Sequence, residues 1–282
     1  MIHSRLELEA FVERALIEDV GEGDHTSLST IPLGIESKAQ LLVKENGILA
    51  GVDVALEIFK KVDPQLKVEL FKKDSEKVVV GDIVLKVYGS VHSILIAERL
   101  VLNVMQRMSG IASITNKIVQ LVADTKCKIL DTRKTTPGLR FLEKEAVLIG
   151  GGFNHRFGLY DMILIKDNHV DYAGGIKNAL VNAKNYLKKI QKNIPIEIET
   201  RNLSELKEAL EEGGFFRVML DNYSFEDIKT AVSMVNGTIE VEASGGITIE
   251  NVREYALCGV DCISMGALTH SVKSLDLSLK AF

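Results

Sequence analysis

The second half of the chain alternates short apolar runs with helical stretches, and this alternation restricts the possible folds more than any other feature. Six runs are nearly continuous in apolar residues, as buried parallel strands are: residues 128–131, 162–165, 194–198, 217–220, 239–241 and 262–265. Helical apolar spacing occurs over residues 174–190, 202–212, 224–235 and 248–257. Alternating strands and helices predict βα units, which build a barrel or a doubly wound sheet. We favour an incomplete, open α/β barrel of about six to seven strands, because a closed TIM barrel needs eight.

The first part of the chain follows a different pattern. Between residues 36 and 92, short β-branched runs separated by turn sequences predict antiparallel strands, interrupted by one helix over residues 52–61. Residues 1–20 have the spacing of an amphipathic helix, and residues 93–123 predict two helices with a break at Gly110. A small α+β unit is therefore expected to precede the barrel.

Composition excludes several classes of protein. With 46% apolar residues among 282, the chain can bury a large core, and its formal net charge of −5 argues against general binding to nucleic acids or membrane surfaces. Apolar runs are interrupted by charge before they reach the length of a membrane span, so we expect a cytoplasmic protein. Cys127, Cys258 and Cys262 lack the number and spacing of a disulfide framework or a zinc site, so we expect them in the core.

Polar residues follow every predicted strand. They occupy residues 131–138, 166–169, 199–201, 221–222, 243–248 and 266–270. Any one of these segments could be an ordinary surface loop, but the carboxyl ends of barrel strands are where ligands bind. Six polar segments in the same register therefore predict one binding site.

Two of these segments have the sequence of phosphate-binding loops. Ser244, Gly245 and Gly246 are expected to lead directly into a helix, where backbone N–H groups can approach an anion at the positive end of the helix dipole. A second loop after the next strand consists of Gly266, Ala267 and Leu268. Because barrels commonly hold phosphate after their last strands, the pair of loops predicts a phosphate site.

Basic side chains gather around the first two strand ends, although the chain as a whole is acidic. Crowded cations repel one another and lose hydration, so they need an anionic partner. Arginine and lysine both suit carboxylates and phosphates. We therefore predict a ligand with several negative charges, bound by Arg133, Lys134, His155, Arg156 and Lys166.

Two carboxylates, Glu199 and Asp221, are expected across the mouth of the barrel from these cations. Carboxylates beside bound phosphates can hold a magnesium ion or stabilise a cationic centre. The alternative is that both acids pair with neighbouring lysines and arginines.

The segment over residues 150–158 begins with three glycines, which predict a flexible loop that could close over a ligand. It carries His155, for which a catalytic role and a structural role remain equally open. His25 lies among acidic residues, but their spacing matches no metal-binding motif, so a capped turn is the better interpretation.

At these residues the sequence closely resembles the quinolinate phosphoribosyltransferase family. The motifs that carry the resemblance extend over nearly the whole chain: EDVGEGDHTS, ERLVLNVMQRMSGIAS, DTRKTTPGLR with LEKEAV, GGGFNHRFGLYDMILIKDNH, IEIET, VMLDN, VEASGGIT and ISMGALTH. The resemblance implies an N-terminal α/β sandwich domain over residues 1–110, joined by the tail 271–282, and an α/β barrel domain over residues 111–270. It also implies a homodimer or larger assembly, in which each active site borrows residues from the neighbouring subunit.

The family reaction joins quinolinate to 5-phosphoribosyl-1-pyrophosphate (PRPP) with Mg²⁺ and no organic cofactor. It gives nicotinate mononucleotide, CO₂ and pyrophosphate for NAD biosynthesis. The resemblance implies that Lys134, Glu199 and Asp221 are catalytic, and that Mg²⁺ binds with PRPP near the last two. It implies substrate contacts from Arg99 of the neighbouring subunit and from Thr132, Arg133, Lys134, His155, Arg156, Lys166, Glu199, Asp221, Ser244, Gly245, Gly246, Gly266, Ala267 and Leu268.

Three other functions fit parts of the pattern. A phosphoribosyltransferase for another aromatic acid would keep the phosphate loops but change the basic pocket. An aldolase-type barrel could use Lys166 to form a Schiff base. A phosphate-ligand sensor without catalytic activity could share the loops but would not need both acids.

Overall fold

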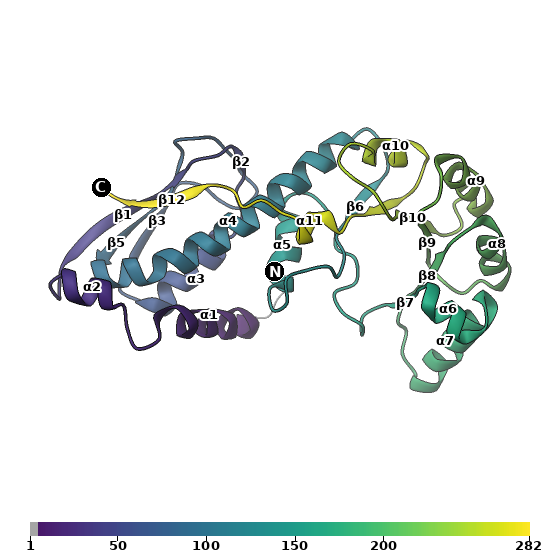
Figure 1. Cartoon of the computed structure of the whole chain (residues 1–282), viewed down its shortest axis with the longest axis horizontal. Coiled ribbons are helices and arrows are strands. Elements are labelled where there is room, and N and C mark those ends of the chain that lie inside the picture. The colour runs from purple at the N-terminus through teal and green to yellow at the C-terminus, as the bar shows by residue number, and fades with distance from the viewer. Residues whose placement is uncertain (1–4) are drawn as a thin grey trace. The chain divides into compact units, whose positions relative to one another are not determined.

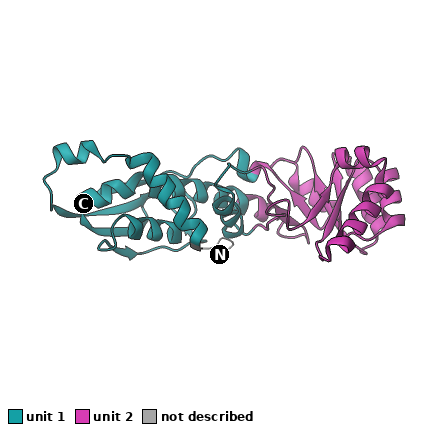
Figure 2. Cartoon of the chain, turned by 90° about the horizontal axis from the view of Figure 1, so that it is seen from below, with its two compact units in different colours: residues 1–116, 135–151, 268–282 teal, residues 117–134, 152–267 magenta. Residues whose placement is uncertain are grey.

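The computed structural model describes residues 5–282, which form two compact units (Figure 2). The first unit contains the residues up to 116 together with residues 135–151 and 268–282, and the second contains residues 117–134 and 152–267. Among the described helices, none has both the length and the apolar character needed to cross a membrane.

The first unit contains the antiparallel strands predicted between residues 36 and 92. Its main sheet has the order β12 (Leu277–Ala281), β1 (Glu36–Val43), β5 (Ile83–Ser90) and β3 (Lys67–Leu70), and a second sheet pairs β2 (Gly47–Ile48) with β4 (Lys77–Val78). Ala39, Leu41 and Val43 are buried while the residues between them are more exposed, as in a strand with one face on the core. Because β12 pairs with β1, the C-terminal tail extends the sheet formed by the first part of the chain.

The helices of this part of the chain are α1 (Arg5–Val20), α2 (His25–Thr30), α3 (Val52–Val62), α4 (Val91–Leu121) and α5 (Arg140–Ile149). Helix α3 confirms the helix predicted over residues 52–61. Helix α1 matches the helix predicted over residues 1–20, of which residues 1–4 lie outside the described part. The carboxylate of Asp24 accepts the backbone N–H of Ser27, so the segment around His25 is capped as predicted.

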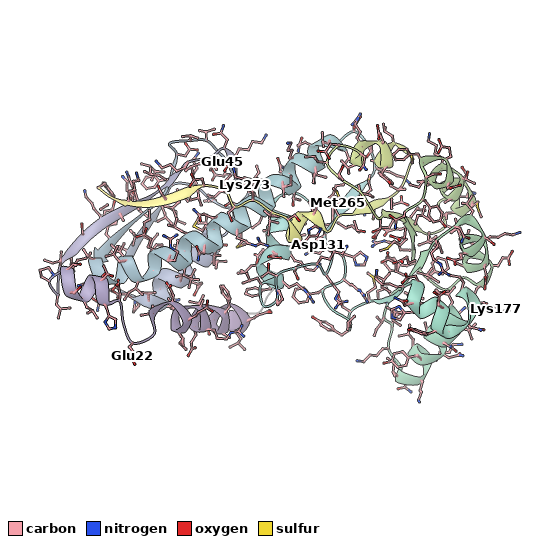
Figure 3. The ribbon with its side chains drawn as sticks, in the orientation of Figure 1. Glu22, Glu45, Asp131, Lys177, Met265 and Lys273 are labelled. Carbon is pink, nitrogen blue, oxygen red and sulfur yellow. The ribbon has the colours of Figure 1, made fainter. Side chains whose placement is uncertain are left out.

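The predicted break at Gly110 is wrong, because α4 continues through this residue. Gly110 is required by packing rather than by a turn. A Cβ atom built on Gly110 would lie 2.3 Å from the backbone oxygen of Lys273, in the tail that leads to β12. The ion pair between Lys273 and Glu45, at 3.0 Å, also holds this tail to the first unit (Figure 3). The glycine thus allows the tail to pass directly over the helix.

We predict that Gly110→Ala destabilises the protein, although alanine is intrinsically the better helix former by about 1 kcal/mol. The added methyl group must displace backbone, and such overpacking costs about 1–3 kcal/mol. Denaturant unfolding monitored by circular dichroism measures the change. The control is Asn103→Ala, at an exposed position of the same helix, which should change stability by no more than about 0.5 kcal/mol. Unchanged or increased stability of Gly110→Ala would contradict this interpretation.

The second unit is the predicted open α/β barrel. Its parallel strands are β6 (Lys128–Leu130), β7 (Ile163–Ile165), β8 (Ile196–Thr200), β9 (Arg217–Asp221), β10 (Glu240–Ser244) and β11 (Cys262–Ser264), in the order β6-β11-β10-β9-β8-β7. Because β6 and β7 are the two edges of this sheet, the barrel does not close. All six predicted strands are present, and Cys127, Cys258 and Cys262 are buried as expected.

Helices α6 (Asp167–Ala173), α7 (Ile176–Ile190), α8 (Leu203–Glu212), α9 (Phe225–Val235), α10 (Val252–Leu257) and α11 (Ala267–His270) connect or follow the strands. Figure 1 shows α7, α8 and α9 along the outer side of the sheet, which favours the barrel over the doubly wound alternative. The helix predicted over residues 248–257 begins only at Val252, after a turn. The expectation that Ser244, Gly245 and Gly246 lead directly into a helix is therefore wrong.

The glycine-rich segment is fixed along the edge of the barrel rather than forming a free loop over it. Phe153 bridges to Leu130 of β6, and its N–H donates to the carbonyl of Ile129. The N–H of Asp131 donates in turn to the carbonyl of Phe153. This short extension beside β6 holds the following residues, His155 and Arg156, at the barrel.

Candidate functional site

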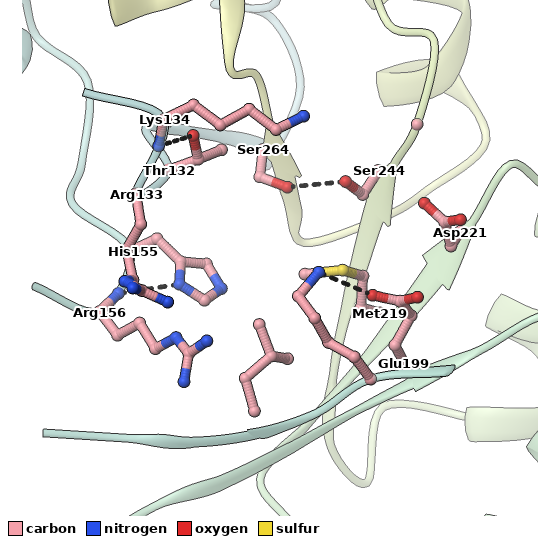
Figure 4. A pocket seen from close by; sticks show the side chains of 13 residues that line it. Thr132, Arg133, Lys134, His155, Arg156, Glu199, Met219, Asp221, Ser244 and Ser264 are labelled. Atoms are coloured by element: carbon pink, nitrogen blue, oxygen red, sulfur yellow. Dashed lines mark hydrogen bonds and ion pairs between the residues drawn. The ribbon is translucent and has the colours of Figure 1, made fainter. Parts of the chain in front are cut away.

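A cavity of about 380 Å³ lies at the carboxyl ends of the barrel strands (Figure 4). This volume is within the range of small-molecule sites. The residues predicted from the sequence that line it are Thr132, Arg133, Lys134, His155, Arg156, Lys166, Glu199, Asp221, Ser244 and Gly245. The structure therefore brings together both groups of charged residues and one of the two predicted phosphate loops.

The other predicted site residues do not line this cavity. Arg99 is an exposed residue of α4 in the first unit, and Gly246 directly follows the lining residue Gly245. Gly266 precedes α11, where Ala267 begins the helix and the side chain of Leu268 is fully buried. Leu268 could therefore meet a ligand only through its backbone.

Every strand of the barrel contributes to the cavity. Thr132 to Lys134 follow β6, and Lys166 follows β7 as the N-cap of α6. Glu199 lies on β8, Asp221 ends β9, Ser244 ends β10 and Ser264 ends β11. Parallel strands present their carboxyl ends on one side of a sheet, which explains how residues far apart in sequence share one site.

Arg133 and Arg156 lie on one side of the cavity (Figure 4). The Nε atom of Arg133 is buried and has no hydrogen-bond partner among residues 5–282. Burial, followed by the charge of Arg133, lowers the pKa of Arg156 from its usual value. A buried donor without a partner and mutual repulsion between guanidinium groups both favour binding of an anion here.

Glu199 and Asp221 lie on the opposite side of the cavity (Figure 4). The Nζ atom of Lys166 donates to Glu199 Oε2 at 3.1 Å, so the pairing that the sequence left open does occur at this acid. Asp221 accepts a hydrogen bond of 2.7 Å from the side chain of Asn222. Carboxylate oxygens are the ligands that Mg²⁺ prefers, so the chemistry of these two side chains fits that ion.

The backbone at Gly245 is shaped by a close approach. Gly245 has a φ of +91°, and a Cβ atom there would lie 2.3 Å from the side-chain oxygen of Asn222. Only glycine fits this position. The loop therefore keeps its backbone accessible at the cavity wall, as binding of a phosphate requires.

Sequence reasoning missed three lining residues, Leu164, Met219 and Ser264. Met219 lies two residues before Asp221 on β9, so the alternation of side chains along a strand places both on the same face. The same rule could have identified Ser264, whose hydroxyl donates to that of Ser244 at 3.2 Å on the neighbouring strand.

Sequence reasoning also missed a group of charged residues buried in the barrel. Glu197 and Glu242 have fully buried side chains, and Arg217 from β9 lies beside them. Arg217 Nη1 lies 3.1 Å from Glu242 Oε2 and 3.7 Å from Glu197 Oε2. Burial holds the pKa values of both glutamates above their usual range, against the opposing effect of Arg217. Burial also lowers the pKa of Arg217, but neighbouring acidic groups, with Glu197 first and a hydrogen-bonded Glu240 among them, outweigh this and keep it raised.

These glutamates also approach His155. Its Nε2 atom lies 3.0 Å from Glu197 Oε2 and 3.5 Å from Glu242 Oε2. One nitrogen and two carboxylate oxygens within 4.8 Å of one another could bind a metal ion. However, the guanidinium of Arg217 already provides positive charge at this place, so the group does not need a metal to balance its charge.

The sequence is similar to those of known proteins over nearly its whole length. Residues 24–109 match the family model of the quinolinate phosphoribosyl transferase N-terminal domain, and residues 111–280 match that of its C-terminal domain. The chain is 50% identical over 293 residues to a chloroplastic carboxylating nicotinate-nucleotide pyrophosphorylase of Arabidopsis thaliana, covering 99% of this chain and 84% of that protein. It is 42% identical over 277 residues to a probable enzyme of the same name from Bacillus subtilis, covering 98% and 94%.

A solved structure of the nicotinate-nucleotide pyrophosphorylase from Francisella tularensis has the same fold. It superimposes with a TM-score of 0.91 at 40% identity and covers 99% of this chain and 98% of that one. The similarity therefore extends over both compact units.

We predict that Arg217→Met destabilises the protein by about 3–5 kcal/mol, because it leaves two buried carboxylates without their cation. Denaturant unfolding at neutral pH provides the measurement. The matched control is Arg253→Met, which breaks an exposed ion pair with Asp124 and should cost no more than about 1 kcal/mol. Equal effects of the two substitutions would show that Arg217 does not balance the buried charge.

Proposed function

The chain belongs to the quinolinate phosphoribosyl transferase family, and from this we propose that it transfers the phosphoribosyl group of PRPP to quinolinate. The products are nicotinate mononucleotide, CO₂ and pyrophosphate, as in NAD biosynthesis. The observation that carries the proposal is the cavity at the carboxyl ends of the barrel strands, where cations face two carboxylates. Its two sides suit the two substrates, a dicarboxylate and a sugar that becomes positively charged as it reacts.

Quinolinate would bind on the cationic side. Arg133 and Arg156 can each form paired hydrogen bonds with a carboxylate, and Lys166 adds a point charge. The buried Nε atom of Arg133, without a partner among the described residues, is a donor that a substrate carboxylate would satisfy. His155 and Thr132 would complete this side of the cavity.

PRPP would bind between the glycine loop and the acidic side. Ser244, Gly245 and Gly246 would hold the 5-phosphate, together with the second loop of Gly266, Ala267 and Leu268. Glu199 and Asp221 would contact the ribose hydroxyls and Mg²⁺, since their carboxylate oxygens suit that ion. When bound, Mg²⁺ would neutralise charge on the pyrophosphate group.

The electrostatics of the cavity suit the bond changes. The pyrophosphate leaves C1 of the ribose with the bonding electron pair, and the ring nitrogen of quinolinate forms the new bond to C1. Glu199 and Asp221 would stabilise the positive charge that develops on the sugar. The pyridinium ring then accepts electron density as the bond from C2 to its carboxylate breaks, and C2 takes up a proton. Because the ring itself accepts these electrons, no organic cofactor is needed. We assign the assisting role in this last step to Lys134.

The alternative functions are less consistent with the cavity. A Schiff-base mechanism needs an amine at Lys166 that is free to attack a carbonyl, but this amine already donates to Glu199 Oε2 at 3.1 Å. An aromatic acid with one carboxylate would leave part of the cationic side without a partner. A sensor without activity would bind the sugar phosphate without releasing pyrophosphate and would not need both Glu199 and Asp221, which both line the cavity.

The direct test is to incubate the protein with quinolinate, PRPP and Mg²⁺ and to measure the products. We expect CO₂ and pyrophosphate in equal amounts, both dependent on each substrate. Arg133→Ala should raise the KM for quinolinate about tenfold or more, because it removes a charge-assisted contact of roughly 1.5–3 kcal/mol. Absence of either product from the wild-type protein would refute the proposed function.

We also propose that the protein works as a homodimer or larger assembly, in which Arg99 of the partner subunit completes the quinolinate site. Arg99 is exposed on α4 and does not line the cavity, which supports a role outside its own barrel.

We further propose that the chain divides into two functional domains at residue 110 and that the protein is located in the cytoplasm. The three buried, unpaired cysteines agree with that location.

Hybrid assemblies test the shared site. Arg99→Ala and Lys166→Ala subunits should each be inactive alone, but a mixture should recover activity, because a hybrid dimer contains one intact site. Mass spectrometry of isotope-labelled subunits verifies that exchange has occurred. Complete inactivity of a mixture with verified exchange would contradict the contribution of Arg99 from the partner subunit.

A further inference from the structure

Asn222 connects the acidic side of the cavity to the glycine loop, the segment over residues 244–246. Its side-chain nitrogen Nδ2 donates to Asp221 Oδ2 at 2.7 Å, and its backbone N–H donates to the carbonyl of Ser244 at 2.9 Å. Asp221 and Ser244 are themselves paired as the last residues of β9 and β10. Asn222 therefore extends this pairing by one residue and bonds to both the acid and the start of the loop.

The side chain of Asn222 also packs against the glycine loop. A Cβ atom on Gly245 would lie 2.9 Å or less from the carbon, oxygen and nitrogen atoms of the Asn222 amide group. The amide thus occupies the space that a side chain at Gly245 would need. Because the same amide group donates to Asp221, one small side chain restricts the spacing between the acid and the loop.

The backbone of Asn222 limits which residues suit this position. Its φ of +56° lies in the left-handed region, which glycine, asparagine and aspartate adopt most readily. Glycine has no side chain to reach Asp221. Aspartate has no donor when ionised and would place a second negative charge beside Asp221. Among these three residues, only asparagine combines the backbone conformation with a hydrogen-bond donor.

Asn222 is exposed and does not line the cavity, whereas Asp221 and Gly245 both do. Asn222 can therefore act on a ligand through these two neighbours. A separate contact holds the other end of the loop, because Asn251 Nδ2 donates to the carbonyl of Gly246 at 3.2 Å. Loss of the Asn222 side chain should thus change the spacing between acid and loop without releasing the loop.

We propose that Asn222 is a positioning residue for the phosphoribosyl group, because it sets the spacing between the Asp221 carboxylate and the glycine loop so that one sugar phosphate can contact both. The inference deepens the proposed function, on which it rests for the identity of the ligand. A ribose 5-phosphate group carries its ring hydroxyls and its phosphate at different ends, so it needs the acid and the loop at a fixed distance. Quinolinate, on the cationic side, does not.

Ribose 5-phosphate is the direct probe, because it has both ends of the phosphoribosyl group but no pyrophosphate to lose. Asn222→Gly keeps the left-handed backbone and removes the amide. We expect the Kd for ribose 5-phosphate, measured by isothermal titration calorimetry, to rise about 5- to 30-fold in this variant. The KM for PRPP should rise similarly, while the KM for quinolinate stays within about twofold of wild type. A merely structural role would weaken the binding of both substrates.

Asn236→Gly provides the matched control. Asn236 is the exposed C-cap of α9, has a φ of +48° and does not line the cavity. This variant makes the same substitution in the same backbone conformation, so it should leave the three binding constants unchanged. Melting curves of both variants verify that they are folded.

A double-mutant cycle tests whether Asn222 acts through Asp221. Asp221→Asn removes the charge that accepts the hydrogen bond, while the glycine loop still holds the phosphate and keeps binding measurable. In this background Asn222→Gly should raise the Kd for ribose 5-phosphate by a factor at least threefold smaller than in wild type.

Two results would overturn the proposal. One is an equal effect of Asn222→Gly in both backgrounds of the cycle, and the other is equal weakening of ribose 5-phosphate and quinolinate by this substitution. Absence of CO₂ and pyrophosphate from the wild-type reaction, together with the expected changes in ribose 5-phosphate binding, would refute only the proposed reaction.

Discussion

Crowding of like charge in one cavity is the constraint on which the rest of the site depends. Arg133 and Arg156 lie close enough for the first to lower the pKa of the second, and Lys134 and Lys166 line the same space. Such a group is unfavourable unless it gains a partner. Glu199 balances one of these cations within the protein, at Lys166. The two guanidinium groups are suited to an anionic ligand, and the barrel holds them in place.

Beside this cavity, the barrel holds a second charged group, in which the two glutamate side chains are closed to solvent and Arg217 is 11% exposed. Barrels usually fill their interior with branched apolar side chains. Here Glu197, Glu242 and Arg217 occupy that interior, at the positions that β8, β10 and β9 direct inward. A buried ion pair seldom adds stability compared with apolar packing, so its presence favours a role in specificity or positioning. His155 lies between the two groups and connects the buried charges to the wall of the cavity.

Much of the fold and of the site could be predicted, because both depend on periodic patterns. The apolar runs located the six strands, and the residues after them located Arg133, Lys166, Glu199 and Asp221 in one cavity. Which side chains meet inside the barrel depends on the register in which neighbouring strands pair, and the sequence does not give this register. Alternation along β8 places Glu197 on the same face as Glu199, but only the pairing of β8, β9 and β10 shows that Arg217 and Glu242 meet it. The need for glycine at position 110 could not be predicted either, because it arises from the close approach of Lys273, which is remote in the sequence.

We propose that the cationic wall of the barrel cavity binds a pyridine dicarboxylate. A crystal structure of the protein with quinolinate bound tests this most directly. We expect the two carboxylates to contact the guanidinium groups of Arg133 and Arg156, with the ring nitrogen directed toward Glu199 and Asp221. Quinolinate bound away from both arginines, or with its nitrogen directed away from the acids, would contradict it.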